Sequence, residues 1–291
     1  MRRFVLLAAG LGVLCSEASS KSRDVVRLQP VEPWNLHYAD DSCRLLRPFG
    51  TGDDQVILVL DQFVPGDWFR MSLIGEKLPD KNSGAKGTVR FGPDEAASEV
   101  RVTLGTSGEK RALFVNESVR IAPLTKAEEK KDAPEPAPIG EAREAAAKWL
   151  ELKKLYRDVV LETGSMAKPL AGLRACSWET VGSWGLDVEQ QKKLTRKPET
   201  KRSASTWFDA SEYPPSMIAG GHQGVVNFRM IVDAKGKATA CHIQKSTRPQ
   251  EFDDLVCKSA MKRARFEPAL DAEGKPVPSY WHGTVRFVIQ G

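Results

Sequence analysis

The chain has 291 residues, of which 41% are hydrophobic and 28% are charged, and this composition is typical of globular proteins. At roughly 100 to 200 residues per domain, the length predicts two domains. The net charge of +5 lacks the concentration of basic residues expected of nucleic-acid-binding proteins, so nucleic acid is excluded as the expected partner.

The first twenty residues have the three parts of a signal peptide. Arg2 and Arg3 precede an apolar run over residues 4–15, and small residues follow the run. This run is shorter than the ~20 residues that a membrane-spanning helix needs. We therefore expect a signal peptide over residues 1–20 and a mature protein in the periplasm. An uncleaved N-terminus that anchors the chain in the inner membrane is the alternative.

The remaining cysteines predict disulfides. Loss of Cys15 with the signal peptide leaves Cys43, Cys176, Cys241 and Cys257 in a compartment where disulfides persist, and four cysteines allow three pairings. Cys241 and Cys257 are close in sequence, and a strand followed by a loop and a helix could bring them together. Cys43 is then left for Cys176. Four buried free thiols are the alternative.

The first part of the chain predicts a β-rich domain. From residue 34 to 121, short apolar runs and alternations are separated by Gly, Pro, Asp and Asn, which is typical of strands and turns. The predicted strands are 55–63, 68–75, 87–92, 99–105, 111–115 and 118–122. With its helices, this domain is predicted to cover residues 21–186.

Two helices and two irregular segments follow these strands. Residues 123–138 are charged and proline-rich, and predict an extended linker or an exposed loop. Apolar residues at helical spacing over 142–160 predict one amphipathic helix. A second helix is predicted from Ser165, which would cap it, to Gly182 or Gly185. Residues 187–210 are basic without an apolar face, and predict a solvated tether between the domains.

Catalytic and metal-binding patterns are weak in this chain. Ser165 and Lys168 have the spacing of a serine–lysine nucleophile pair, but the companion motifs of such enzymes are missing, so no enzyme and no catalytic residue is predicted. His242 with Cys241 and Cys257 could bind a metal, although an oxidising compartment favours the disulfide. We expect no metal and no cofactor. Trp34, Trp68 and Trp149 could line a ligand groove, or pack in the core.

The C-terminal module, residues 211–291, has the clearest pattern. Residues 224–246 predict two strands joined by a turn at 233–236. Val226, Phe228, Met230 and Val232 form a fully apolar face of the first strand, and the alternate residues form a polar face. A helix follows over residues 249–266, and a last strand over residues 279–290. The predicted fold class is α+β, with a β-rich N-terminal domain and a β-β-α-β module.

The module resembles a known family. The strings GVVNFRMIVDAKGKATACHI, FDDLVCKSAMKRARFEPA and GKPVPSYWHGTVRFVI occur in the order of the C-terminal domain of the TonB energy-transducer family, over residues 213–289. The pair Cys241 and Cys257 resembles a disulfide-bearing variant of that domain. Classical members have a membrane helix and a long proline-rich spacer, whereas this chain has a predicted signal peptide, a short proline tract and an unrelated β-rich domain. Force transmission is therefore not expected.

The resemblance implies a partner and a binding mode. Such domains capture the TonB box, an extended peptide of an outer-membrane transporter, as an added strand beside the last strand of the sheet. On this sequence the binding edge is expected at His282, Gly283, Thr284, Val285, Arg286, Phe287, Val288 and Ile289. The expected partner is a TonB-dependent outer-membrane receptor or another envelope protein, which links the chain to transmembrane transport. An envelope scaffold, whose module only docks or forms a homodimer, is the alternative.

Overall fold

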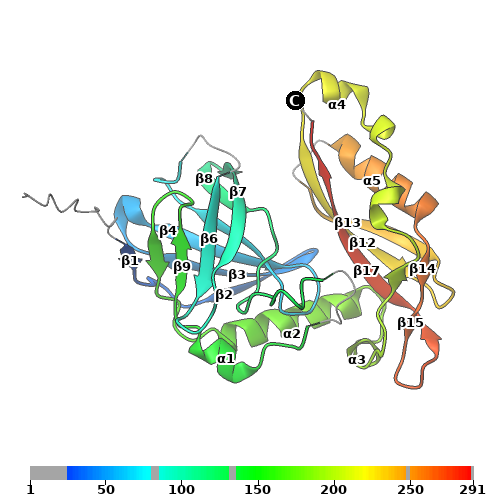
Figure 1. Ribbon diagram of the computed structural model, residues 1–291, viewed down its shortest axis with the longest axis horizontal. Helices are drawn as coiled ribbons and strands as arrows, with labels where there is room; N and C mark the ends of the chain where they lie inside the picture. Colours follow the sequence, from blue (N-terminus) through cyan, green and yellow to red (C-terminus); the bar gives the residue numbers. More distant parts are fainter. Residues whose placement is uncertain (1–24, 80–84, 131–135, 247–249, 290–291) are drawn as a thin grey trace, which may run out of the picture.

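A computed structural model describes residues 25–79, 85–130, 136–246 and 250–289. The predicted signal peptide lies outside these residues. The described chain forms an N-terminal domain, residues 25–186, beside the C-terminal module, and α2 (Ala167–Ser183) runs along the N-terminal domain toward the module (Figure 1). The α+β class is confirmed, with a β-rich part preceding the module.

The N-terminal domain is built from one continuous ten-stranded sheet. Its strands are β1 (Val26–Leu28), β2 (Asn35–Ala39), β3 (Ser42–Phe49), β4 (Val56–Gln62), β5 (Arg70–Ile74), β6 (Lys86–Phe91), β7 (Ser98–Ser107), β8 (Lys110–Val115), β9 (Leu150–Lys153) and β10 (Val159–Leu161). The spatial order is β1-β10-β9-β6-β7-β8-β5-β4-β3-β2. Residues 98–101 of β7 pair with β6, and residues 102–107 pair with β8. The strand β7 therefore joins two half-sheets.

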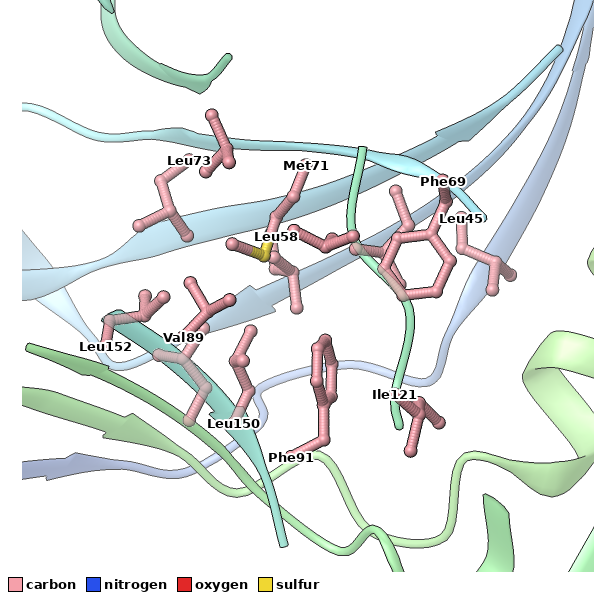
Figure 2. Close-up of a cluster of buried hydrophobic side chains, with 14 of the residues drawn as sticks. Leu45, Leu58, Phe69, Met71, Leu73, Val89, Phe91, Ile121, Leu150 and Leu152 are labelled. Atoms are coloured by element: carbon pink, nitrogen blue, oxygen red, sulfur yellow. The ribbon is translucent and has the colours of Figure 1, made fainter. Parts of the chain in front are cut away.

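The two half-sheets face each other across one hydrophobic core. Figure 2 shows Leu58 and Met71 from β4 and β5 pointing toward Phe91 and Leu150 from β6 and β9, and all four are at most 2% exposed. A bridge between Pro30 and Phe49 brings the two ends of the sheet together. With β7 joining the half-sheets at one side and this bridge joining them at the other, the domain is a closed sandwich.

Two helices cover one end of this domain. The short α1 (Glu141–Ala146) precedes β9, and α2 packs against β3. Gly185, with a φ of +81°, follows α2 and allows the chain to turn. The disulfide between Cys43 in β3 and Cys176 in α2 has a Cα–Cα distance of 6.0 Å. The predicted second helix and this predicted pairing are both present.

Three local predictions are wrong. The helix predicted over residues 142–160 ends at Ala146, because Leu150 and Leu152 then alternate with polar residues and enter the sheet as β9. The strand predicted over 118–122 is reduced to a single bridge between Val119 and Phe69. The N-cap of α2 is Met166, so Ser165 does not cap it.

The C-terminal module is a three-stranded antiparallel sheet covered by a helix. Its main elements are β12 (Gly224–Val232), β13 (Ala238–Ser246), α5 (Gln250–Arg263) and β17 (Ser279–Phe287), in the sheet order β13-β12-β17. The apolar face of β12 is at most 1% exposed, as predicted, and packs against α5. Shorter elements are α4 (Pro215–Ala219), η3 (Ala210–Glu212), β14 (Phe266–Glu267), β15 (Ala269–Leu270) and β16 (Pro276–Val277).

The segment predicted as a solvated tether is instead bound to the module. Residues 187–210 contain α3 (Val188–Lys192), β11 (Glu199–Thr200) and η2 (Ala204–Trp207), and β11 pairs with β14. Trp207 is 2% exposed within the core of the module. The sequence of residues 187–210 did not indicate these contacts, because one buried aromatic residue and a two-residue strand produce no periodic pattern of apolar residues.

Candidate partner-binding edge

The sheet of the module rests on a rigid core. The rings of Phe252 in α5 and Phe287 in β17 are stacked, with 4.1 Å between their centroids. The disulfide between Cys241 in β13 and Cys257 in α5 holds helix and sheet together, with a Cα–Cα distance of 5.5 Å. A closed loop of about 16 residues stabilises a fold by roughly 3 kcal/mol in the chain-entropy account. The strands therefore have little freedom to shift against the helix.

The strand β17 is a regular strand at the border of this sheet. It pairs with β12 over nine consecutive residues, from Ser279 to Phe287, without a shift in register. Among the described residues, no strand pairs with its other side over residues 282–287. An unpaired border strand presents backbone N–H and C=O groups that can pair with another strand.

The opposite border strand, β13, is less regular. Its pairing with β12 shifts in register twice, so that Thr239 and Gln244 are extra residues on β13. Such bulges twist a border strand and protect it from pairing with other chains. The side-chain amide of Gln244 also donates to the carbonyl oxygens of Asp41 and Phe63 of the N-terminal domain. Of the two border strands, β17 is therefore the more regular one.

The polar face of the sheet is docked on the N-terminal domain. Arg229 of β12 forms an ion pair with Asp41 at 2.9 Å, and Lys245 of β13 forms one with Asp61 at 3.0 Å. The side chains of Arg229 and Asp61 are only 13% and 4% exposed. In Figure 1 the sheet accordingly lies between the N-terminal domain and α5.

A second group of contacts joins β17 to the N-terminal domain. Arg70 of β5 donates through Nη2 to Oδ1 of Asn227 and to Oγ1 of Thr284, both at 3.3 Å. Arg70 and Arg286 also donate to the same acceptor, the backbone carbonyl of Asn116. Two arginines, one from each domain, thus meet beside β17.

The chain between the domains adds a third contact. Trp184, just after α2, packs edge-to-face against Tyr280 of β17, with 5.2 Å between ring centroids. The side-chain amide of Gln191 donates to the carbonyl of Pro278 at 2.9 Å and accepts from the Ser279 hydroxyl at 2.6 Å. Side chains at both ends of β17 therefore have contacts outside the sheet of the module.

The sequence of this β-β-α-β module matches a known family. Residues 209–289 match the family model of the Gram-negative bacterial TonB protein C-terminal. The match covers the C-terminal module, and the N-terminal domain lies outside it. No curated protein matches this sequence. The match to the TonB domain indicates a protein of the cell envelope that is linked to transport.

Within residues 25–79, 85–130, 136–246 and 250–289, every helix is too short or too polar to cross a bilayer.

The residues expected at the TonB-like binding edge lie mostly in β17. His282, Thr284 and Arg286 point to the docked face, whereas Val285 and Phe287 pack toward α5. A Cβ atom on the second residue of this stretch, Gly283, would lie 2.4 Å from the Trp281 ring, so a side chain there would displace the indole. The strand ends at Phe287, and the last two predicted residues follow it. These are Val288, which is 60% exposed, and Ile289.

His282 has an unusual environment. Burial among the surrounding atoms, and then the charges of Lys197 and Arg70, lower its pKa to about 4. The side chain nevertheless keeps more than a third of its surface in contact with solvent. The ring is neutral near pH 7 and adds no charge to the edge.

The other candidate sites do not converge. Cys241 and Cys257 are joined to each other, which removes them as metal ligands, and the described residues hold no group of three potential ligands. The three N-terminal tryptophans have different neighbours: Trp34 contacts Phe49, Trp68 lies beside Arg120, and Trp149 lies beside Arg90. They therefore do not line a common groove.

Sequence reasoning missed the contribution of the N-terminal domain to this site. Arg70, Asp41 and Asn116 had no recognisable motif, and the polar face of the sheet was predicted only as polar. Arg229 and Arg286 on that face were the available signal for a docked domain. Cationic residues also occur on faces exposed to solvent, so this signal did not decide between the two.

Proposed function

We propose that this protein is a periplasmic binding protein that captures an extended segment of an envelope partner as an added strand on β17. The observation that carries this proposal is the contrast between the two border strands. The strand β17 is regular over nine residues and unpaired on its outer side, whereas β13 has two bulges and contacts the N-terminal domain. Strand addition needs a regular border of this kind.

The partner is a TonB-dependent outer-membrane receptor, on the evidence of the match of residues 209–289 to the TonB C-terminal family. In strand addition, backbone hydrogen bonds give affinity, and pockets for alternate side chains give specificity. The function is therefore binding, and it requires no cofactor. The N-terminal domain holds the module in one orientation and so presents β17 to the partner.

The test uses peptides that carry a TonB box and a pair of proline variants. In an antiparallel sheet the N–H groups of successive residues point to opposite sides, so one of Thr284 and Val285 directs its N–H to β12 and the other directs it outward. Proline removes the N–H in either case. Of Thr284→Pro and Val285→Pro, the variant at the residue whose N–H points outward is expected to keep the thermal stability of the wild-type protein. We expect this variant to lose peptide binding, measured by isothermal titration calorimetry.

The outcome separates the two candidate roles. Peptide binding that persists in a folded proline variant would overturn strand addition at β17. If the wild-type protein binds no TonB-box peptide but sedimentation shows a dimer that the folded proline variant loses, the edge serves a second copy of the chain. That result would support the scaffold instead.

A further inference from the structure

Charges are unevenly matched across the interface between the two domains. On the side of β12 and β13, the carboxylates of the N-terminal domain are well paired. Asp41 contacts Arg229 and His242, and Asp61 contacts Arg44 and Lys245. Both carboxylates are therefore engaged on the side of β12 and β13.

On the side of β17 the cations are in excess. Arg70 and Arg286 share the carbonyl of Asn116, and no carboxylate of the described residues lies within ion-pair distance of either. The neighbouring acid, Glu117, accepts from the side chain and the backbone N–H of Arg101, each at 2.9 Å. The carboxylate next to Asn116 is therefore already engaged with Arg101.

The environment of Arg70 agrees with this imbalance. Desolvation, and then the charge of Arg286, lower the pKa of Arg70, while Glu117 acts in the opposite direction. Both arginines stay charged at neutral pH, since an arginine keeps its proton in proteins. A cation pair without a bound anion is a site that a carboxylate would stabilise.

The cation pair lies where a strand added to β17 would place its side chains. Thr284 and Arg286 are two residues apart and share the docked face of β17, and Arg70 donates to the Thr284 hydroxyl. A residue directly opposite on an added strand has its Cβ atom about 5 Å from that of its neighbour on β17. An acidic side chain at that position reaches both guanidinium groups.

We propose that Arg70 and Arg286 form a subsite for an acidic side chain of the strand that pairs with β17, so that the protein prefers acidic extended peptides. This inference rests on the proposed function. It adds that the N-terminal domain supplies a specificity residue, Arg70, to a binding edge that belongs to the C-terminal module. The ligand chemistry is a carboxylate on an extended backbone.

The experiment begins with a displayed library of random nine-residue peptides selected on the full-length protein. We expect Asp and Glu to be enriched at one position of the selected peptides. For one selected peptide and its twin with Glu replaced by Gln, we expect the acidic form to bind about three- to tenfold more tightly, because a charged hydrogen-bonded pair is replaced by a neutral one.

Variants then test whether Arg70 and Arg286 cause the preference for the acidic peptide. Arg286→Gln and Arg70→Gln are expected to bring the ratio of the two affinities close to one while the Gln peptide binds as before, and Arg286→Lys is expected to keep part of the ratio. Arg90→Gln is the control, because it makes the same change in charge at a site paired with Glu151 in the N-terminal domain. If Arg70→Gln does not fold, Arg286→Gln still tests the subsite, because this side chain is exposed.

Each result has a defined meaning. Selected peptides without acidic enrichment, or an unchanged affinity ratio in the arginine variants, would overturn the subsite and leave strand addition standing. An equal loss of affinity for both peptides in the variants would show that the arginines only hold the domains together. A selection that yields no binding peptide would overturn the subsite together with the proposed function.

Discussion

The guanidinium group of Arg229 lies over the indole ring of Trp184, with 4.4 Å between its Cζ atom and the ring centroid. Arg229 belongs to the sheet of the module, and Trp184 follows the last turn of α2. Trp184 also packs against Tyr280, so one side chain contacts two strands of the sheet. A cation–π contact contributes about 0.5–2 kcal/mol, and an aromatic pair about 0.5–1.5 kcal/mol.

Trp184→Ala is expected to loosen the docking of the two domains. The variant removes both contacts of the indole and should leave the two cores intact, because the side chain lies between them. We expect a larger radius of gyration in small-angle X-ray scattering and faster tryptic cleavage within residues 187–210. Trp178→Ala is a matched control, since Trp178 is similarly half-buried on α2 and has Lys192 over its ring. Equal behaviour of the two variants would contradict a docking role for Trp184.

The module was predicted well because its sequence patterns are local and agree with one another. The alternation of Val226, Phe228 and Met230 gives the buried face of β12, and Asp233 with Gly236 gives the turn. Each feature needs only the neighbouring residues. The helix over residues 249–266 was predicted for the same reason, and α5 covers Gln250–Arg263.

The N-terminal domain and the docked face were predicted less well. Residues 142–160 have strong helical composition, and β9 forms only because β6 and β10 offer pairing partners that no local pattern records. Likewise, Arg70 and Thr284 are separated by 214 residues in the chain, so their contact depends on the packing of two domains. Long-range pairing of this kind has no signature in a single sequence.

Gly236 is expected to be far less tolerant of substitution than Gly274, although both close similar turns. Their φ angles are +76° and +75°, which costs a residue with a side chain about 1–2 kcal/mol. A Cβ atom on Gly236 would lie 2.0 Å from the carbonyl oxygen of Phe266, whereas one on Gly274 meets no atom within 4 Å. The first clash is with backbone, and it cannot be relieved by rotating a side chain.

We therefore expect Gly274→Ala to lower the free energy of unfolding by about 1 kcal/mol. Gly236→Ala should lower this free energy by about 3 kcal/mol or more, because the backbone of Phe266 in β14 must also move. Urea unfolding followed by far-UV circular dichroism measures both. A loss of the same size in the two variants would show that the close approach to Phe266 carries no cost.

Glu212 is expected to make the stability of the module depend on pH in the acid range. Hydrogen bonds from Arg263, at 2.6 and 2.7 Å, and then the backbone N–H of Asp209 hold the pKa of Glu212 at about 2. The folded state thus favours the ionised carboxylate relative to the unfolded chain, whose Glu pKa is near 4.5. The stabilisation is present above pH 4.5 and is lost as the pH falls toward 2.

Glu212→Gln removes this dependence, because an amide has no proton to gain over this range. We expect the variant to have a lower urea midpoint than the wild-type protein at pH 5 to 7, and the two midpoints to approach each other as the pH is lowered through this window. Glu189→Gln controls for net charge, since Glu189 is 69% exposed and pairs with Lys192 on the surface. A difference between Glu212→Gln and wild type that stays constant from pH 6 to pH 2 would show that the ion pair with Arg263 does not link folding of the module to protonation.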